Sequence, residues 1–371
     1  MPPVENSVKP FIIPVFIPHA GCPHQCVFCN QKAITRSATQ APSCLQIEDT
    51  IRSYLNYLTP NRKPVQIAFF GGNFLGIDRQ EILRLLTAAA KFVNEGVVDG
   101  IRFSTRPDTL TKDRIEILKG FPVSTIEIGA QSMNDTVLEL CRRGHTARQT
   151  ARAADLAKAG GYETGIQMMV GLPGDDDAGA ISTGRQISDL GPDFVRIYPA
   201  VVLEHSLLAY WYRKGQYAPL SLSAAVSLVK RLYLMFQESN IAVIRMGLQA
   251  TADLENGSIL LAGPFHPAFG HLVISEIYRD KVIELLMSNG RALEEVTLRV
   301  NLKRISTMRG LKNENIHYLK NRFHIRHINV TGDTLMPDHH ITLEEGLRSE
   351  KPCSVAERSG VENKKGIHVF T

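Results

Sequence analysis

The sequence predicts an α/β protein with a parallel sheet, because short apolar runs alternate with segments of helical spacing along most of the chain. With 371 residues, 44% of them hydrophobic, the chain can form one large α/β domain with an appendage or two ordinary domains. Strands separated by helices need crossover connections, so the strands should run parallel in an open sheet or a partial barrel. In both architectures ligands bind at the carboxyl ends of the strands.

Six strands are expected in the first two thirds of the chain. Their ranges are 11–17, 65–70, 100–104, 123–128, 163–169 and 193–198. Apolar residues at helical spacing predict helices over 47–58 and 82–93. Asp78, with Glu81 three residues later, is close to a capping box and predicts where the second of these helices begins.

A smaller second region is expected after residue 247. It should contain two helices and two strands, at 270–288, 311–322, 295–300 and 325–330. The last forty residues have the composition of a loop. We therefore predict a first domain over 1–247, a C-terminal α/β region over 248–335 and a loosely structured tail over 336–371.

Composition excludes several classes of protein. Six cysteines in a chain of this length are too few for a disulfide scaffold. The first ten residues lack the pattern of a secretory signal, and no run reaches the roughly 18 apolar residues of a membrane span, so we expect a soluble cytoplasmic protein. The net charge of +5 permits a polyanionic partner but is also common among ordinary enzymes.

Three cysteines crowd into eight residues directly after the first predicted strand. Cys22, Cys26 and Cys29 form a C-x3-C-x2-C pattern. Thiolates are the ligands of iron–sulfur clusters, and three ligands for four irons leave one iron open to a substrate or cofactor. The alternative is a structural zinc site completed by His19 or His24. Zinc ligands usually come as two separated pairs, however, and no second pair exists here.

This cysteine spacing, with Phe28 before the last cysteine, resembles that of the radical S-adenosylmethionine (SAM) enzymes. The resemblance implies a partial (βα)6 barrel of parallel strands, with a [4Fe–4S] cluster held by the three cysteines and SAM on the open iron. In that family an electron, from a donor such as flavodoxin or ferredoxin, cleaves SAM and yields a 5′-deoxyadenosyl radical. The resemblance also makes Phe28 a candidate contact to the cofactor.

Other candidate cofactor-binding residues lie at the expected strand ends. By resemblance, the turn Gly71-Gly72 binds the amino group of the SAM methionine moiety, although a Gly-Gly pair after a strand is by itself only a turn signal. Asn73 departs from the Glu, Ser or Thr that relatives often have at this position. Gln131 and Gln167 are candidates for contacts to the cofactor ribose or the substrate, and a solvated strand end is the competing interpretation for Gln131.

The order of the motifs narrows the resemblance. FFGGNF, STRPD, IEIGAQSMND, CRRGHT, GLPG and FVRIYP together resemble the radical domain of the Elongator catalytic subunit, which starts carboxymethyl modification of the wobble uridine in tRNA. This resemblance covers about residues 10 to 247. Residues 248–371 show no convincing acetyl-coenzyme A phosphate loop, so the chain looks more like the short bacterial relatives of that subunit.

Two basic segments are candidates for contact with tRNA. The run from Arg142 to His145 contacts RNA phosphate or is a solvated helix end. The second segment forms an electrostatic footprint for tRNA if its side chains gather on one face, and scattered surface charge is the alternative. Its members are Arg299, Lys303, Arg304, Arg309, Lys312, Lys320, Arg322 and Arg326, with His317, His324 and His327.

We therefore expect a radical SAM enzyme that modifies a tRNA base. Methylthiotransferases are disfavoured, since the remaining cysteines are too far apart to hold a second cluster. Oxygen-independent coproporphyrinogen oxidases share the radical domain, so a tetrapyrrole or another small metabolite is an alternative substrate. A third hypothesis is a non-catalytic nucleic-acid binding protein with structural zinc.

Overall fold

The structure is a computed structural model that describes residues 10–17, 21–30, 41–58 and 64–345. The chain divides into two compact units, residues 1–277 and 278–371. In the described residues, no helix is both long and apolar enough to cross a membrane.

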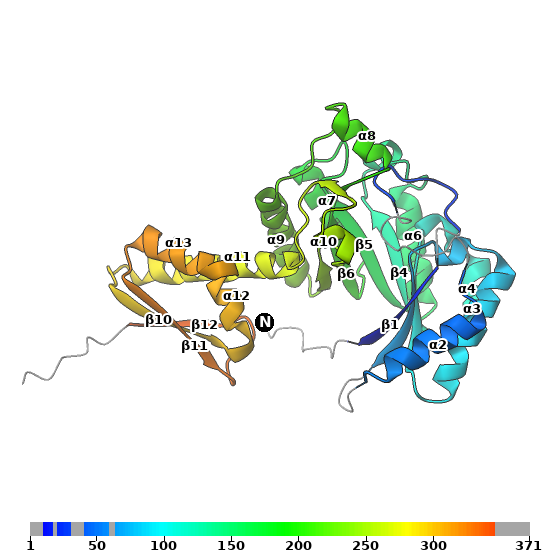
Figure 1. Ribbon diagram of the computed structural model, residues 1–371, viewed down its shortest axis with the longest axis horizontal. Helices are drawn as coiled ribbons and strands as arrows, with labels where there is room; N and C mark the ends of the chain where they lie inside the picture. The colour runs from blue at the N-terminus through cyan, green and yellow to red at the C-terminus, as the bar shows by residue number, and fades with distance from the viewer. Residues whose placement is uncertain (1–9, 18–20, 31–40, 59–63, 346–371) are drawn as a thin grey trace, which may run out of the picture. The chain divides into compact units, whose positions relative to one another are not determined.

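The first unit is built on one sheet of seven parallel strands, in the order β1-β2-β3-β4-β5-β6-β8 (Figure 1). The strands are β1 (Phe11–Phe16), β2 (Val65–Phe70), β3 (Gly100–Thr105), β4 (Val123–Gln131), β5 (Glu163–Val170), β6 (Phe194–Pro199) and β8 (Ala242–Met246). The six predicted strands and the partial parallel barrel are confirmed. The seventh strand, β8, was not predicted, because it is a short edge strand whose residues are only partly buried.

Helices follow the strands, and the longer ones cover the outer face of this sheet (Figure 1). The longer ones are α2 (Cys44–Leu55), α3 (Arg79–Asn94), α6 (Ala147–Ala159), α7 (Asp177–Asp189) and α9 (Leu222–Glu238). The short ones are η1 (Phe74–Gly76), η2 (Pro107–Thr109), α4 (Lys112–Leu118), α5 (Asp135–Leu140), α8 (Leu207–Arg213) and α10 (Ala252–Glu255). A two-stranded ribbon pairs β7 (Val202–Leu203) with β9 (Leu260–Ala262).

Helix α3 begins where the sequence predicts. The Asp78 side chain accepts a hydrogen bond from the Gln80 backbone N–H, so Asp78 is the N-cap. Glu81 does not complete a capping box, because it forms an ion pair with Arg84 one turn later.

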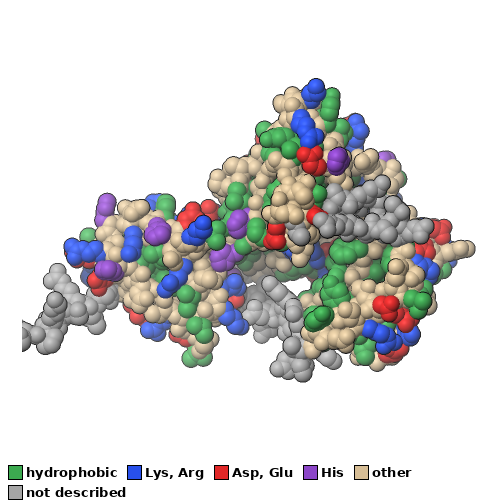
Figure 2. Space-filling view, viewed as in Figure 1, with side chains coloured by type: hydrophobic (Ala, Val, Ile, Leu, Met, Phe, Trp, Pro, Cys, Tyr) green, Lys and Arg blue, Asp and Glu red, His purple; other side chains and the backbone are tan. Residues whose placement is uncertain are grey.

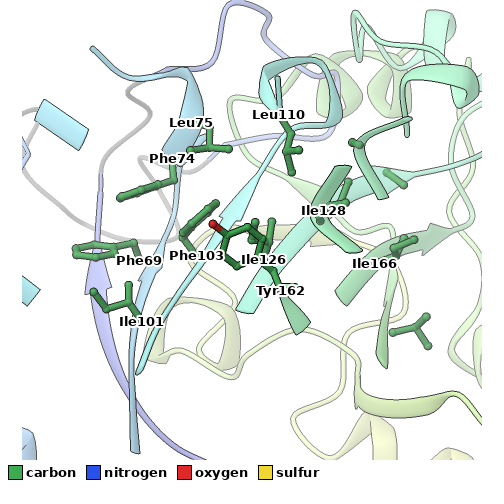
Figure 3. Close-up of a cluster of buried hydrophobic side chains, with 14 of the residues drawn as sticks. Phe69, Phe74, Leu75, Ile101, Phe103, Leu110, Ile126, Ile128, Tyr162 and Ile166 are labelled. Carbon is green, nitrogen blue, oxygen red and sulfur yellow. The ribbon is translucent and has the colours of Figure 1, made fainter. Parts of the chain in front are cut away.

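The main core lies between the sheet and its helices. Figure 3 shows side chains of β2, β3, β4 and β5 packed together there. Phe74 of η1 is fully buried and stacks on Phe69 and Phe103, with ring centroids 5.0 and 4.6 Å apart. The segment that follows the Gly71-Gly72 turn is therefore anchored in the core.

The second unit contains a three-stranded sheet in the order β11-β10-β12. Its elements are β10 (Glu295–Asn301), η3 (Leu302–Arg304), α12 (Ile305–Arg309), η4 (Leu311–Asn313), α13 (Glu314–Phe323), β11 (His327–Asp333) and β12 (Ile341–Glu345). The helix α11 (Phe269–Asn289) passes from the first unit into the second. Its residues Phe269, Val273 and Ile277 belong to the core of the first unit.

Strand β12 lies in the segment that the sequence predicts to be a loose tail. It pairs antiparallel with β10, placing Leu343 opposite Leu298 and Ile341 opposite Val300. Leu298, Val300 and Ile341 are buried, so this pairing extends the small core of the unit. Residues 346–371 of the predicted tail lie outside the described residues.

Candidate metal centre and active site

The three clustered cysteines lie on the loop that leaves the carboxyl end of β1. Cys26 is buried, whereas Cys22 and Cys29 are partly exposed. The backbone N–H of Cys29 donates to the carbonyl oxygen of Cys26 at 3.1 Å, which forms a tight turn between these two residues. The loop therefore presents thiols at the mouth of the half-barrel, where parallel sheets bind their ligands.

Hydrogen bonds to two other elements hold the middle of this cysteine loop. The Val27 N–H donates to the Cys141 carbonyl at 3.2 Å, and the Leu208 N–H donates to the Val27 carbonyl at 2.8 Å. The Val27 side chain is fully buried in a small cluster at the rim of the sheet, and Phe28 packs against the same cluster. One side of Phe28, a predicted cofactor contact, is thus used for packing.

Asn73 ties the start of the cysteine loop to β3 and η2. Its Nδ2 donates to the Gly21 carbonyl at 2.6 Å. Its Oδ1 accepts from the Thr105 hydroxyl at 2.8 Å, the Arg106 N–H at 3.0 Å and the Thr109 hydroxyl at 2.8 Å. The side chain is 1% exposed, and these protein contacts occupy both ends of its amide.

Glycines let the backbone segments around Asn73 approach closely. Gly21 has φ +80°, and a Cβ there would lie 2.5 Å from the Asn73 carbonyl oxygen. Gly71 has φ +96°, and a Cβ there would lie 3.0 Å from the carbonyl oxygen of Ile17, at the end of β1. The structure therefore brings the predicted Gly71–Asn73 turn to the base of the cysteine loop.

Arg143 makes a direct contact with the cysteine loop. Its Nη1 donates to the Cys26 Sγ at 3.1 Å, and its Nη2 donates to the Gly129 carbonyl at 2.5 Å. The carbonyl of Arg143 accepts a hydrogen bond from Arg106, which also pairs with Asp108 at 2.9 Å. Arg143 is only 6% exposed, so the sequence interpretation of this residue as an RNA contact or a solvated helix end is wrong.

The rest of the basic run from Arg142 to His145 divides between surface and interior. Arg142 is exposed, with φ +53°. His145 is buried, and its Nε2 lies 3.2 Å from the Ala130 carbonyl, so for His145 too the prediction of an RNA contact is wrong. Burial, together with the nearby positive charge of Arg143, lowers the pKa of His145 to about 4. His145 is therefore neutral at neutral pH.

The donor set fits an iron–sulfur cluster, because thiolates are its ligands and each of the three cysteines on this loop can bind a different iron. Zinc ligands usually come as two separated pairs, and the sequence offers no second pair. His24 packs against Gly144, and His19 lies outside the described residues.

The backbone of Cys141 contacts the cysteine loop, but its thiol differs from those of the three loop cysteines. It is fully buried among apolar side chains. Burial raises the pKa of its thiol to about 12, so it stays protonated at neutral pH.

The two predicted glutamines lie at the carboxyl end and on the inner face of the sheet. Gln131 ends β4 at a register irregularity and has φ +69°, a conformation that costs energy outside glycine and clusters at functional sites. Gln167 of β5 pairs in register with Gly129 and Arg196 and is partly exposed. Neither glutamine side chain has a hydrogen-bond partner in the described structure, so both amides are available to a ligand.

The inner face of the sheet also carries charges that the sequence analysis missed. Glu127 is 1% exposed and pairs with Arg102 at 3.0 Å and with Arg196 at 2.8 Å. Arg196 of β6 also lies over the ring of Phe70 of β2, 5.6 Å from its centroid, so it reaches across the interior of the half-barrel. A single arginine within each of the apolar strands GIRFS, FVRIY and AVIRM was the signal that could have revealed this set.

A cavity of about 500 Å³ lies beside the turn that follows β5. Its lining includes Leu140, Trp211, Tyr217 and the segment 171–175. The Tyr217 hydroxyl donates to the Gly171 carbonyl at 2.7 Å. Burial raises the pKa of Asp175 at the edge of this cavity to about 6. The GLPG segment of the motif series thus forms a wall of this cavity.

Two family models match the part of the chain that contains these features. The Radical SAM superfamily model matches residues 16–187, and the Radical_SAM C-terminal domain model matches residues 192–279. The chain belongs to the radical SAM superfamily. It is therefore an enzyme of that superfamily, whose cofactors are a [4Fe–4S] cluster and SAM, and the hypothesis of a non-catalytic zinc protein is wrong.

Similar proteins support the predicted subgroup. The chain is 28% identical to the uncharacterized protein MJ0486 of Methanocaldococcus jannaschii over 231 residues, covering 60% of this chain and 70% of that protein. It is 27% identical to the tRNA uridine(34) acetyltransferase of Dehalococcoides mccartyi over 231 residues, covering 53% of this chain and 50% of that protein. The chain thus spans only half the length of the acetyltransferase.

A solved structure has the same fold. The Elp3 of Methanocaldococcus infernus, with an N-terminal deletion, superposes with a TM-score of 0.57 at 18% sequence identity, covering 73% of this chain and 63% of that one. The predicted resemblance to the Elongator catalytic subunit is confirmed as a distant similarity.

Proposed function

We propose that this radical SAM enzyme modifies a base in tRNA. The observation that carries the proposal is the similarity of the radical SAM region to tRNA uridine(34) acetyltransferases, over 231 residues in one of them. Acetyl transfer is not part of the proposal, because the chain matches only half of that enzyme. When bound, the cluster and SAM supply reductive cleavage of a C–S bond and a carbon radical that removes hydrogen from the substrate.

Each predicted site residue has a role in this proposal. Cys22, Cys26 and Cys29 bind three irons of the cluster. The backbone of Gly71 and Gly72 binds the methionine end of SAM, since the two glycines lie beside the base of the cysteine loop and are partly exposed. Phe28 packs against two small clusters and is partly exposed, and we propose that the exposed part of its ring contacts the cofactor.

The remaining polar residues divide into two groups. The free amides of Gln131 and Gln167 contact the cofactor ribose or the substrate base. Asn73 has a different role from the one expected of a cofactor ligand, because protein contacts occupy both ends of its side-chain amide. We propose that Asn73 positions the cysteine loop and that only its backbone is available to SAM.

The basic residues of the second unit support an RNA partner. Arg299, Arg304 and Arg326 form ion pairs with acidic residues of the same unit. Of the basic residues in the predicted segment 299–326, five have no ion pair in the described structure, and all five lie in helical segments: Lys303, Arg309, Lys312, Lys320 and Arg322. Figure 2 shows the basic side chains of this unit interspersed with acidic ones, so any tRNA contact uses these five rather than a uniform basic surface.

The first test of this function is anaerobic. Protein reconstituted with iron and sulfide should cleave SAM to 5′-deoxyadenosine when a reductant, or a donor such as flavodoxin or ferredoxin, is present. Single Ala replacements of Cys22, Cys26 or Cys29 should abolish cleavage, whereas Cys44→Ala, at an exposed cysteine outside the loop, should not. Cleavage that survives loss of a loop cysteine contradicts the cofactor assignment.

The substrate is tested by nucleoside analysis of tRNA from cells with and without the gene, where a missing modified base is expected. Gel shifts with tRNA at low salt test the partner, with the triple variant K303Q/K312Q/K320Q binding more weakly and with a smaller salt dependence. The triple variant R299Q/R304Q/R326Q removes the same charge from ion-paired positions and is the matched control. If the nucleosides are unchanged and the protein has no affinity for tRNA, the substrate is instead a small metabolite, such as a tetrapyrrole. This result would not affect the assignment as a radical SAM enzyme. The predicted cytoplasmic location suits either substrate.

A further inference from the structure

The inner face of the half-barrel carries more positive charge than its own residues neutralise. Arg102 of β3, Arg196 of β6 and Arg245 of β8 lie on this face. Among the described residues, the buried carboxylate on this face is Glu127, which Arg102 and Arg196 share. Glu163, at the start of β5, is exposed and accepts a hydrogen bond from Thr125 at 2.5 Å.

Arg245 is the member of this set without an ion pair in the described structure. Its Nε donates to the Gly247 carbonyl at 3.3 Å, a neutral partner close in sequence. Its Cα pairs in register with that of Arg196 on the neighbouring strand, so two like charges lie side by side. Burial is the main cause that lowers the pKa of Arg245, and the charge of Arg196 adds to it, whereas Tyr198 and Glu127 act in the opposite direction. A partly buried guanidinium that has a like charge beside it and no ion pair in the described structure is suited to binding an anion.

The position of Arg245 connects it with the cysteine loop. Gly129, Gln167, Arg196 and Arg245 occupy paired positions on the adjacent strands β4, β5, β6 and β8. At one end of this row, the Gly129 carbonyl accepts from Arg143, which also donates to the Cys26 sulfur. At strand spacings of about 4.8 Å, the row is roughly 15 Å long. A substrate whose reacting atom lies near the cluster can therefore extend over Gln167 and place a second group at Arg245.

We propose that Arg245, assisted by Arg196, binds an oxyanion of the substrate, a phosphate or a carboxylate. Guanidinium groups bind both anions through paired, charge-assisted hydrogen bonds. The Tyr198 hydroxyl, 3.3 Å from the Nη1 of Arg196, adds a polar group to the same subsite. This inference rests on the proposed function as a radical enzyme and specifies its substrate: a tRNA nucleotide supplies a phosphate, and a small metabolite supplies a carboxylate.

The test measures thermal unfolding of the cluster-loaded full-length protein in sodium chloride, sodium phosphate and sodium acetate at one ionic strength. Phosphate, acetate or both should raise the melting temperature of the wild type in a saturable way. R245Q should weaken the apparent affinity for that anion about tenfold or more, and R245K less than R245Q. R231Q removes a guanidinium that pairs with Asp177 on the helical layer, and should behave as wild type. Stabilisation by only one of the two anions distinguishes a phosphate-bearing from a carboxylate-bearing substrate, and stabilisation by both supports the oxyanion subsite without choosing between them.

A second readout separates ligand binding from a structural role. In chloride alone, R245Q should be about as stable as the wild type or more stable, because it removes a partly buried charge that has no ion pair in the described structure and lies beside Arg196. A large loss of stability in chloride, an anion effect equal in wild type and R245Q, or no effect of either anion each overturns the proposal. Wild-type cleavage of SAM is measured independently, so failure of the anion test with intact cleavage refutes this inference alone.

Discussion

Replacing Asn73 tests whether one side chain holds the cysteine loop in place. The Asn73 amide makes four hydrogen bonds, to Gly21, Thr105, Arg106 and Thr109, at 2.6 to 3.0 Å. A hydrogen bond within a protein contributes a net of about 1 kcal/mol, so Asn73→Ala should lower the free energy of unfolding by about 4 kcal/mol. The loss of unfolding free energy should not fall much below this value, because the site is buried and water cannot replace the lost hydrogen-bond partners.

Asn73→Asp separates loop attachment from general stability. The carboxylate keeps the three bonds accepted by Oδ1 but replaces the Nδ2 donor by an acceptor that faces the Gly21 carbonyl. This change should release the start of the cysteine loop, so the variant should bind less iron and sulfide per chain than its stability alone explains. Asn134→Asp is the matched control, because the Asn134 side chain only accepts, from the Thr136 N–H, and Asp caps a helix equally well.

Urea unfolding gives the free energies, and iron and sulfide analysis after anaerobic reconstitution gives the cluster content. A loss below about 1 kcal/mol for Asn73→Ala, with full iron content in both variants, would refute the argument that Asn73 organises the loop. Reduced iron in Asn134→Asp would show that the measurement does not report on the loop.

Three further changes test other parts of the site. Arg143→Met removes a charged hydrogen-bond donor from the Cys26 sulfur, so the midpoint potential of the cluster should become more negative. Arg142→Met, at the exposed neighbour, should leave this potential unchanged, and electron paramagnetic resonance measures it in both variants. The pKa of buried His145 is about 4 in the folded protein and near 6.5 in the unfolded chain, so the unfolded chain binds more protons between these values and stability rises with pH. Relative to His145→Gln, the free energy of unfolding of the wild type should rise by roughly 2 kcal/mol between pH 5 and 6.5. A difference that stays constant with pH would contradict the burial argument. Gly21→Ala should impair both folding and iron binding, because its Cβ would meet backbone atoms of the turn that begins at Asn73, and wild-type iron content would show that this packing is not needed.

Much of the fold could be predicted because buried parallel strands appear in the sequence as short apolar runs. The apolar runs at 65–70 and 123–128 are strands because both faces of the sheet exclude water there. Strand β8 was missed because AVIRM at the sheet edge is short and half-exposed. The Gly71–Asn73 turn lies beside the cysteine loop because parallel strands end at the same edge, so turns far apart in sequence meet there; its contact with SAM stays a prediction.

The roles of Arg143 and Asn73 could not be predicted because they depend on contacts between segments far apart in the chain. A basic run is usually solvated, and only the fold reveals that Arg143 points inward to a cysteine 117 positions earlier. For Asn73, the sequence shows an amide in a position often occupied by Glu, Ser or Thr in relatives, but not the four partners that occupy it. In both cases the sequence shows the residue type but not the residues that it contacts in the folded protein.

The support of the cysteine loop has a consequence for how the site forms. Its start is held by Asn73 after β2, its middle by backbone atoms of Cys141 and Leu208, and the Cys26 sulfur by Arg143. These supports come from segments that follow β2, β4 and β6, so the loop reaches its final geometry only when most of the half-barrel has folded. In many small metal sites the metal drives folding of its ligands. Here contacts from three parts of the sheet support the loop, so we expect the first unit to fold without the cluster and the cluster to add less to its free energy of folding than a metal adds in such small sites.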